Sequence, residues 1–559
     1  MSNNGFEMSR RALLRNSAVF GGSAFLLAAC GTSGSSGNTA IKATSLVSAT
    51  GGPGDKVPAG VKLGNNKSLT LALSNMPASV DPMVEVGGDG RRFDIYECLV
   101  DQSPVSGAPR PFLATSWKQV NETTYDFTLR QGVKFHNGDP LTTDDVIFSL
   151  QRAANPTYAT AVNFATFASA TAVDAQTVRV TTSAPDVLFI KKIASISILP
   201  KNYYTSLGAT DKARAAAFAQ APVGTGPYKF VSYTTSKSVV EIAPTTWRHP
   251  TIQQITTLQV TDTGTQLNSF LAGSAQYINL MPISAIGSLN KAGATLIELV
   301  KGNDLGAFID SVDMGGAPKT GPMGSKQVRQ ALNYGIDKNT LINNVLKGKT
   351  VSDNGQLIAA GLPGYTSTVT SYPYDVAKAK QLLDAAGYPA KNGGSRFTMS
   401  MATAFAGPGS ARLLIGEYLQ NDLAALGIDV TYQAMTDIAT EIDYFYDIKQ
   451  RPDIYHFGLF SRPFMDAARP FNYFTTASKN YHMSNPQFDS LFEQQQGEFD
   501  AAKRQAILAQ MAEILHDEAT FLFSTQDMWL DAAAKNLRGM VQADVQTEQY
   551  YDLLYFVAD

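Results

Sequence analysis

Cysteine, histidine and tryptophan are scarce in this 559-residue sequence, which contains 2, 5 and 3 of them, respectively. Two cysteines cannot build a disulfide framework or a cysteine cage for zinc. The histidines lie far apart, without the spacing of a helical metal site. They are His136, His249, His456, His482 and His516. We therefore expect surface or ordinary polar roles for them, and we expect no metal and no cofactor.

Catalytic signatures are also missing. The sequence has no His-Glu-x-x-His, no phosphate-binding Gly-x-x-x-x-Gly-Lys, no Gly-x-Gly-x-x-Gly and no Gly-x-Ser-x-Gly. These absences disfavour an enzyme. Charged residues make up only 17% of the chain and the formal net charge is −3. Because nucleic-acid binding calls for a basic patch or stripe, we expect no nucleic-acid partner.

Long hydrophobic runs are absent after the N-terminus. The apolar stretch from Ala18 to Ala29 is interrupted by glycine and falls short of the roughly 20 residues that span a bilayer. It follows Arg10 and Arg11, as in a secretory signal of the twin-arginine type. The run Leu27-Ala28-Ala29-Cys30 resembles a bacterial lipobox, in which the cysteine carries lipid. We therefore predict a signal peptide at 1–29, lipidation of Cys30 and membrane attachment through this lipid only.

The remaining 559 − 29 = 530 residues are too many for one ordinary core and predict two or more domains. Residues 30–65 are rich in Gly, Ser, Thr and Ala, which predicts a flexible tether. Alternating apolar residues at 69–73 and 125–129 predict strands. Later in the chain, Asp337 and Asp375 are placed to cap helices. The pattern is that of an α/β protein.

Two local motifs have a structural explanation. Asp144 and Asp145 look like a carboxylate pair for acid/base chemistry, but they follow two threonines and precede an apolar helical run. Acidic side chains at this place satisfy the exposed N-H groups of a helix N-terminus, so we expect capping. The segment Gly224-Thr225-Gly226-Pro227-Tyr228 is not followed by a helical pattern. We expect a tight turn into a strand there.

Several segments resemble, in order, the extracellular solute-binding proteins of family 5, whose best-known members are the oligopeptide- and dipeptide-binding components of ABC importers. The resemblance extends over nearly the whole mature chain. The matching segments are Ser79-Val80-Asp81-Pro82, Phe112 to Trp117, Tyr125 to Leu150 with Leu129-Arg130-Gln131-Gly132-Val133-Lys134-Phe135-His136-Asn137-Gly138, Gly224 to Tyr228, Val328 to Asp337, and Asp375 to Pro389.

The resemblance implies a type II periplasmic-binding-protein fold. Two α/β lobes are joined by crossover strands, and the first lobe has an extra subdomain. Mapped onto this sequence, lobe I takes residues 66–302 with the inserted subdomain at about 96–214, lobe II takes 303–524, and 525–559 return to lobe I. The ligand is expected between the lobes, and closure about the hinge buries it.

In peptide-binding members of the family, an aspartate four residues before a proline holds the ligand's amino terminus. Asp466 stands at that distance from Pro470 and is the expected ligand contact. The alternative is a helix cap or a salt bridge with Arg462 or Arg469. Phe460 and Phe464 replace the family's tryptophan and are candidates to line the cleft, with an ordinary core position as the alternative. The missing tryptophan and the extra residues between Gly458 and Asp466 weaken the case for a peptide specifically. Arg462 is a candidate to hold a ligand carboxylate, and a solvated arginine is the alternative.

On the first lobe, Glu85, Val86 and Asp89 follow a segment that in the family leads into the ligand cleft. We expect them to contact the ligand as well. The glycines between and after them allow close approach of the backbone, although a mobile loop explains them equally well.

The combined prediction is a lipid-anchored, exported and monomeric substrate-binding protein without catalytic activity. It works in the periplasm or on the outer face of the cell membrane. It captures a peptide or another small polar solute and delivers it to ABC permease subunits, whose ATPases supply the energy. The alternatives are an exported hydrolase with dispersed catalytic residues and a chemosensory receptor for the same solute.

Overall fold

The computed structural model describes residues 56–84, 93–103, 107–299, 303–313, 316–390, 394–404, 406–407, 410–436, 451–460, 464–478, 482–526, 529–540 and 550–558; side chains are excepted at 299, 303–305 and 459–460. Cys30, Glu85, Val86, Asp89 and Arg462 lie outside these residues, as does most of the expected tether. Within the described part, no helix is long and apolar enough to cross a membrane.

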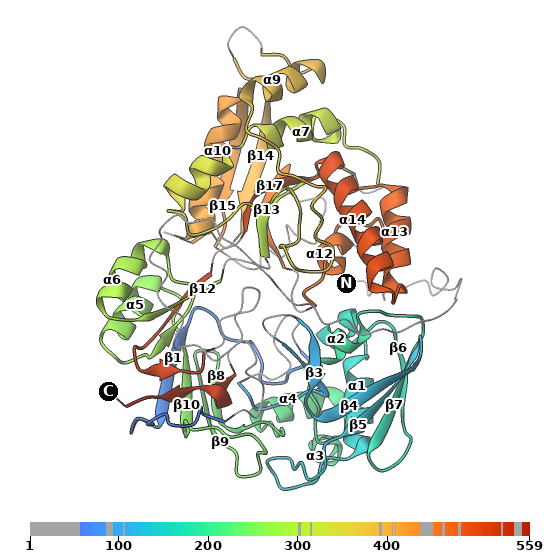
Figure 1. Ribbon diagram of the computed structural model, residues 1–559, viewed down its shortest axis with the longest axis vertical. Coiled ribbons are helices and arrows are strands. Elements are labelled where there is room, and N and C mark those ends of the chain that lie inside the picture. The colour runs from blue at the N-terminus through green and yellow to red at the C-terminus, as the bar shows by residue number, and fades with distance from the viewer. Residues whose placement is uncertain are drawn as a thin grey trace.

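A seven-stranded mixed sheet forms the base of the molecule (Figure 1). Its strand order is β12-β18-β11-β1-β10-β9-β8. The strands are β1 (Ser68–Leu73), β8 (Tyr228–Thr234), β9 (Lys237–Ile242), β10 (Gln254–Gln259), β11 (Tyr277–Ile278), β12 (Thr295–Leu299) and β18 (Trp529–Ala533). Helices α5 (Thr263–Leu271) and α6 (Ile286–Lys291) cover one face, where Phe270 and Leu289 pack against Ala72 of the central strand.

A second, four-stranded sheet is inserted between β1 and β8, with strand order β4-β5-β7-β6. Its strands and the short ladder before it are β2 (Val100–Gln102), β3 (Pro109–Pro111), β4 (Ala114–Asn121), β5 (Thr124–Leu129), β6 (Phe167–Ala172) and β7 (Thr177–Thr182). The helices are α1 (Thr143–Ala153), α2 (Phe189–Ile193), α3 (Lys201–Ser206) and α4 (Asp211–Gln220). Every second residue of β5 is buried, as its alternating sequence predicts.

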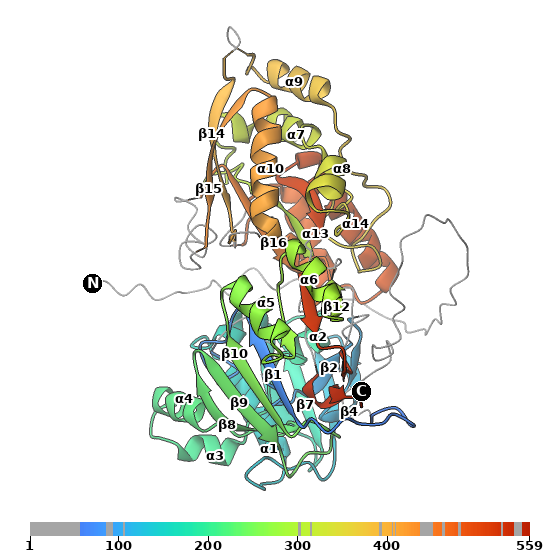
Figure 2. The same ribbon diagram turned by 90° about the vertical axis from the view of Figure 1, so that its left-hand side faces the viewer.

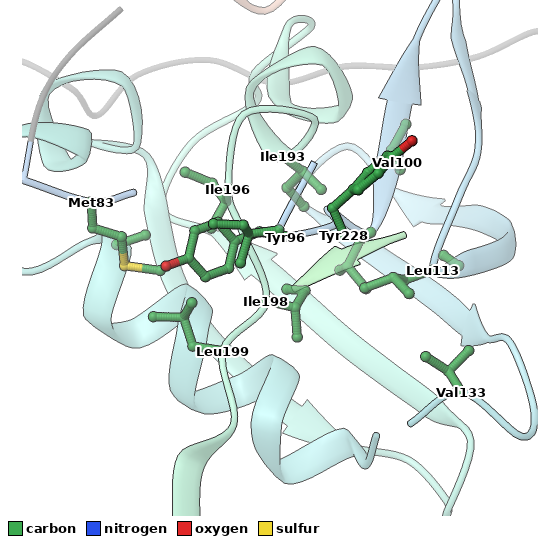
Figure 3. Close-up of a cluster of buried hydrophobic side chains, with 14 of the residues drawn as sticks. Met83, Tyr96, Val100, Leu113, Val133, Ile193, Ile196, Ile198, Leu199 and Tyr228 are labelled. Carbon is green, nitrogen blue, oxygen red and sulfur yellow. The ribbon is translucent and has the colours of Figure 1, made fainter. Parts of the chain in front are cut away.

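The expected capping role of Asp145 is confirmed. Its carboxylate accepts a hydrogen bond from the backbone N-H of Thr142 at 2.9 Å and closes a capping box at the start of α1. This inserted subdomain shares one hydrophobic core with the seven-stranded sheet. In Figure 3, Met83 and Tyr96 lie beside Leu199 and Ile196 in that core. The Tyr96 hydroxyl donates to the carbonyl of Val80 at 3.0 Å, which satisfies its buried polar tip.

The upper body of the molecule is built on a five-stranded sheet of order β15-β14-β16-β13-β17. Its strands are β13 (Asn303–Ile309), β14 (Phe397–Thr403), β15 (Ile428–Ala434), β16 (Ile454–Phe460) and β17 (Phe521–Gln526). Its helices are α7 (Lys326–Tyr334), α8 (Lys338–Thr340), α9 (Val376–Ala385), α10 (Ala411–Ala425), α12 (Ala468–Asn472), α13 (Pro486–Gln496) and α14 (Ala501–Glu518).

Both faces of this sheet are covered, so alternate strand residues enter two different cores. Met401 and Ile454 pack on the side of α10, whereas Tyr455 and Phe521 pack on the side of α14. Asp375 caps α9, as expected, by accepting from the N-H of Lys378 at 2.8 Å. The helix expected after Asp337 is divided instead into α8 and a π-helical turn, η4 (Leu341–Val345).

Two crossovers join the sheets. The chain passes from β12 in the lower sheet to β13 in the upper sheet, and it returns from β17 to β18. The outgoing and returning strands are antiparallel neighbours in both sheets, so they form one ribbon between the two bodies (Figure 2). We call the body up to β12 and from β18 onward lobe I, and the body from β13 to β17 lobe II. The exact boundaries expected from the sequence stay predictions.

Candidate functional site

The edge of the lobe II sheet that adjoins lobe I contains the carboxyl ends of three parallel strands. Asn303, where β13 enters from lobe I, pairs with Phe460 at the end of β16. Thr403, at the end of β14, pairs with Ala434 of β15 and with His456 of β16. The chain leaves the carboxyl end of β14 toward β15 on one side, and it leaves the carboxyl end of β16 toward β17 on the other side. In open α/β sheets, ligands bind at such a divergence beyond the carboxyl ends of the strands.

His456 lies on β16 beside Thr403, four residues before the end of its own strand, and it is an unusual side chain. It is 0% exposed, and neither ring nitrogen has a hydrogen-bond partner within the described structure. Burial, together with the positive charge of Arg412, lowers the pKa of His456 from 6.5 to about 3, so the ring is neutral. A buried polar group without a partner costs about 1 to 3 kcal/mol, and such groups in native proteins call for an explanation. A bound ligand is one explanation.

Helix α10 covers the same side of the sheet. Its N-terminus is capped by Ser410, whose hydroxyl accepts from the N-H of Leu413 at 3.1 Å. Arg412 lies in its first turn. Gly416, one turn later, allows the helix to approach closely, because a β-carbon there would lie 2.4 Å from the Thr403 hydroxyl. The close approach brings the positive helix end and Arg412 to the carboxyl ends of the strands, which favours negative ligand groups.

Asp466 lies in the segment that follows this edge. It is 1% exposed, and its carboxylate accepts two hydrogen bonds from Arg504 of α14, at 2.8 and 2.7 Å. The N-H of Ala468 donates a third at 3.0 Å. Arg504 also donates to the side chain of Gln495 at 2.7 Å. The carboxylate is therefore compensated inside lobe II by a bidentate ion pair.

Phe464 packs between the lobes. It is 6% exposed and contacts Leu188 of the inserted subdomain and Ala468 of lobe II. The expected apolar environment of Phe464 is therefore present, but its neighbours are protein side chains. Its contact with a ligand stays a prediction.

The other expected site residues divide into two groups. Among the described residues, Asp466 forms its salt bridge with Arg504 and not with Arg469, and contact of Asp466 with a ligand stays a prediction. Arg462, Glu85, Val86, Asp89 and the side chain of Phe460 lie outside the described residues, so their roles also stay predictions.

Sequence reasoning missed His456 and Arg504. The expectation of surface or ordinary polar roles for the histidines is wrong for His456 and His482, which are buried and whose ring nitrogens have no hydrogen-bond partner in the described part. A signal for Arg504 exists in the sequence. It occupies the same helical stripe as Leu508, Met511 and Leu515, where a cation needs a buried partner.

Comparison with known proteins agrees with this geometry. The family model described as bacterial extracellular solute-binding proteins, family 5 middle, matches residues 108–482, which is more than half of the chain. Heme-binding protein A of Haemophilus influenzae is 25% identical over 529 residues, covering 88% of this chain and 92% of its own. The glutathione-binding protein GsiB of Pectobacterium atrosepticum is 28% identical over 443 residues, covering 74% of this chain and 80% of its own.

Among solved structures, the periplasmic binding protein DppA of Helicobacter pylori, in complex with the peptide STSA, superposes with a TM-score of 0.74. It is 20% identical, and the match covers 89% of this chain and 99% of DppA. The expected type II periplasmic-binding-protein fold is confirmed, and so is the expectation of a binding protein without catalytic activity. The chain belongs to family 5 of the bacterial extracellular solute-binding proteins.

Proposed function

We propose that the chain captures a small polar solute between its two lobes and delivers it to an ABC permease. The observation that carries the proposal is His456, a fully buried side chain without hydrogen-bond partners in the described part of the chain. It lies on β16 beside Thr403, the last residue of β14, where the connections of these two strands diverge. A solute that supplies polar partners there would remove the cost of the unpaired ring. Arg412 and the N-terminus of α10 favour a solute with a carboxylate or a similar anionic group.

The ligand class remains broad within this proposal. The relatives are named for heme, glutathione and di- or tripeptides. Heme, glutathione and peptides all carry carboxylates, which agrees with the positive charge at the edge. Asp466, Phe464, Phe460, Arg462, Glu85, Val86 and Asp89 are proposed as additional ligand contacts.

A thermal-shift experiment tests the proposal. The mature protein, freed of bound solute by reversible unfolding, is mixed with glutathione, heme or trialanine, and its melting temperature is recorded. A solute that binds only the folded state raises the melting temperature by mass action, and no product forms. We expect one of these solutes to raise the melting temperature. His456→Gln should weaken the binding of that solute at least about tenfold. His249→Gln, at an exposed position, is the matched control and should bind like the wild type. No shift with any of them would count against the peptide-like solute class.

We also propose that Cys30 carries the lipid that keeps the protein at the membrane. The mature protein should partition into the detergent phase of Triton X-114 when expressed with its own leader. Cys30→Ser should move it to the aqueous phase, whereas Cys98→Ser should not, because Cys98 is a buried core residue. Aqueous partitioning of the wild type would remove the anchor from the proposal. Light scattering of the released form tests the proposed monomer.

A further inference from the structure

The inserted subdomain of lobe I contacts lobe II at a place far from the crossover strands. Lys191, on helix α2, reaches across the lobes, and its ammonium group donates to the carbonyl of Phe464 at 2.7 Å. The carbonyl of Met465 lies 3.5 Å from the same nitrogen. In Figure 1, α2 stands at the end of the subdomain that faces α12 and α13. The two residues just before Asp466 are therefore held by a cation from the other lobe.

Three neighbouring contacts make this a continuous interface. The N-H of Val187 donates to the carbonyl of Gln496 at 2.9 Å. Leu188 packs against Phe464 and Ala468. We call this set, with Lys191, the latch interface. Because each contact joins residues of different lobes, a rotation about the crossover ribbon must break or slide all of them together.

The charge of Lys191 also interacts with the buried ion pair of Asp466 and Arg504. Burial lowers the pKa of Lys191 below its usual value, the attraction of Asp466 opposes this change, and the repulsion of Arg504 adds to it. Lobe II supplies one carboxylate and one guanidinium here, and lobe I adds an ammonium only while the lobes are together. The neighbouring Lys192 differs, since it pairs with Asp186 of its own subdomain at 2.6 Å.

We propose that Lys191 is a positioning residue that holds the lobes closed by binding the backbone of residues 464–465, without touching the ligand. The ammonium group of Lys191 then stabilises the closed arrangement of the lobes. If the proposed solute binding is correct, Lys191 also raises apparent affinity. The apparent dissociation constant is the intrinsic one divided by the closed fraction, so each loss of closed molecules weakens binding in proportion.

The test compares Lys191→Met with Lys192→Met in the ligand-free mature protein. Small-angle X-ray scattering measures the radius of gyration, and hydrogen exchange measures protection of the Val187 amide. We expect Lys191→Met to increase the radius of gyration and to speed exchange at Val187 by at least about tenfold. Lys192→Met removes a charge from the same helix but leaves the contact of Lys191 in place, so it should leave the radius of gyration at its wild-type value. Lys191→Arg, which retains a donor of similar reach, should restore both the radius of gyration and the exchange rate.

A merely structural role for Lys191 would lower the melting temperature without changing the radius of gyration of the folded protein. That result, or identical scattering and exchange for both methionine variants, would overturn the proposal. If Lys191→Met does not fold, Lys191→Gln replaces it, because glutamine is too short to span the same distance. The experiments can contradict the proposal for Lys191 and the proposed function independently of each other. Scattering is measured without ligand, whereas the thermal shift reports solute binding in the unaltered protein.

Discussion

Asp466 and Arg504 form a buried bidentate ion pair across 38 residues of lobe II. The pair ties the segment after β16 to helix α14, and Gln495 of α13 joins it through Arg504. Removing one partner of such a pair leaves an uncompensated buried charge, which costs much more than the pair itself contributes. The pair therefore fixes the position of residues 464–468, which contact the other lobe.

Asp466→Asn and Arg504→Met should each lower the free energy of unfolding by about 3 to 5 kcal/mol. The double variant should lose less than the sum, because neither charge is then left alone. Urea unfolding measures all three. Glu241→Gln breaks the half-exposed pair with Lys229 and serves as the control, with an expected loss below about 1 kcal/mol. Unchanged stability of Asp466→Asn, with a loss of solute affinity, would instead support the ligand contact expected from the sequence.

The local structure could be predicted well from the sequence because its signals lie within a few residues. Alternation in β5 and the caps at Asp145 and Asp375 depend only on near neighbours. The order of family-like segments added the two-lobed fold. The division after Asp337 was not predictable, because a π turn replaces regular helix without a clear change in the apolar spacing.

The candidate site was predicted less well, for physical reasons. Asp466 was singled out, but its partner Arg504 lies on another helix, and Lys191 is 273 residues away from Phe464. His456 occupies a strand position at which a polar residue normally faces water. It is buried only because both faces of the five-stranded sheet are covered, one of them by α10. Such contacts depend on packing between distant elements, which no local pattern records.

The pH dependence of stability should reveal Glu97, a fully buried carboxyl in lobe I. It accepts from the indole of Trp247 at 3.1 Å, and it shares Arg248 with Asp94 and Asp552. Burial raises the pKa of Glu97 from 4.5 to about 7, against the attraction of Arg248. Since the folded-state pKa lies above the unfolded value, the contribution of Glu97 to stability is complete below pH 4.5 and is lost as the pH rises through about 7.

Wild-type protein should therefore lose roughly 3 kcal/mol relative to Glu97→Gln between about pH 4.5 and about pH 8, since each unit of pKa shift corresponds to about 1.4 kcal/mol. Urea unfolding at several pH values measures the difference between the two proteins. Glu241→Gln changes a half-exposed carboxylate, and its stability should follow that of the wild type across this pH range. A parallel course for wild type and Glu97→Gln would show that Glu97 is ionised throughout.

For His456, we predict that stability changes with pH in the opposite direction. Its folded-state pKa of about 3 lies below the usual 6.5, so the folded state resists protonation. The stability that the neutral ring allows is present above pH 6.5 and is lost as the pH falls toward about 3. His456→Gln should lose less stability than the wild type over this acid range, and His249→Gln should follow the wild type. Equal acid sensitivity of His456→Gln and the wild type would mean that His456 is not buried in its neutral form.

Two helical glycines offer a matched test of the close approach of α10. A β-carbon at Gly416 would lie 2.3 Å from the Tyr432 hydroxyl and 2.4 Å from the Thr403 hydroxyl, whereas one at Gly287 of α6 meets nothing within 4 Å. Gly416→Ala should therefore cost about 1 to 3 kcal/mol in urea unfolding, because either α10 or the side chains of Tyr432 and Thr403 must shift. Gly287→Ala should be neutral or stabilise by up to about 1 kcal/mol through helix propensity.

The same substitution should also affect the candidate site, since Thr403 pairs with His456 in the sheet. Solute affinity should fall in Gly416→Ala and stay unchanged in Gly287→Ala, which lies in lobe I. Isothermal titration with whichever solute raises the melting temperature measures both. If Gly416→Ala is as stable as Gly287→Ala and binds normally, helix α10 does not pack against Thr403 as closely as described, and Arg412 loses its place at the edge of the site.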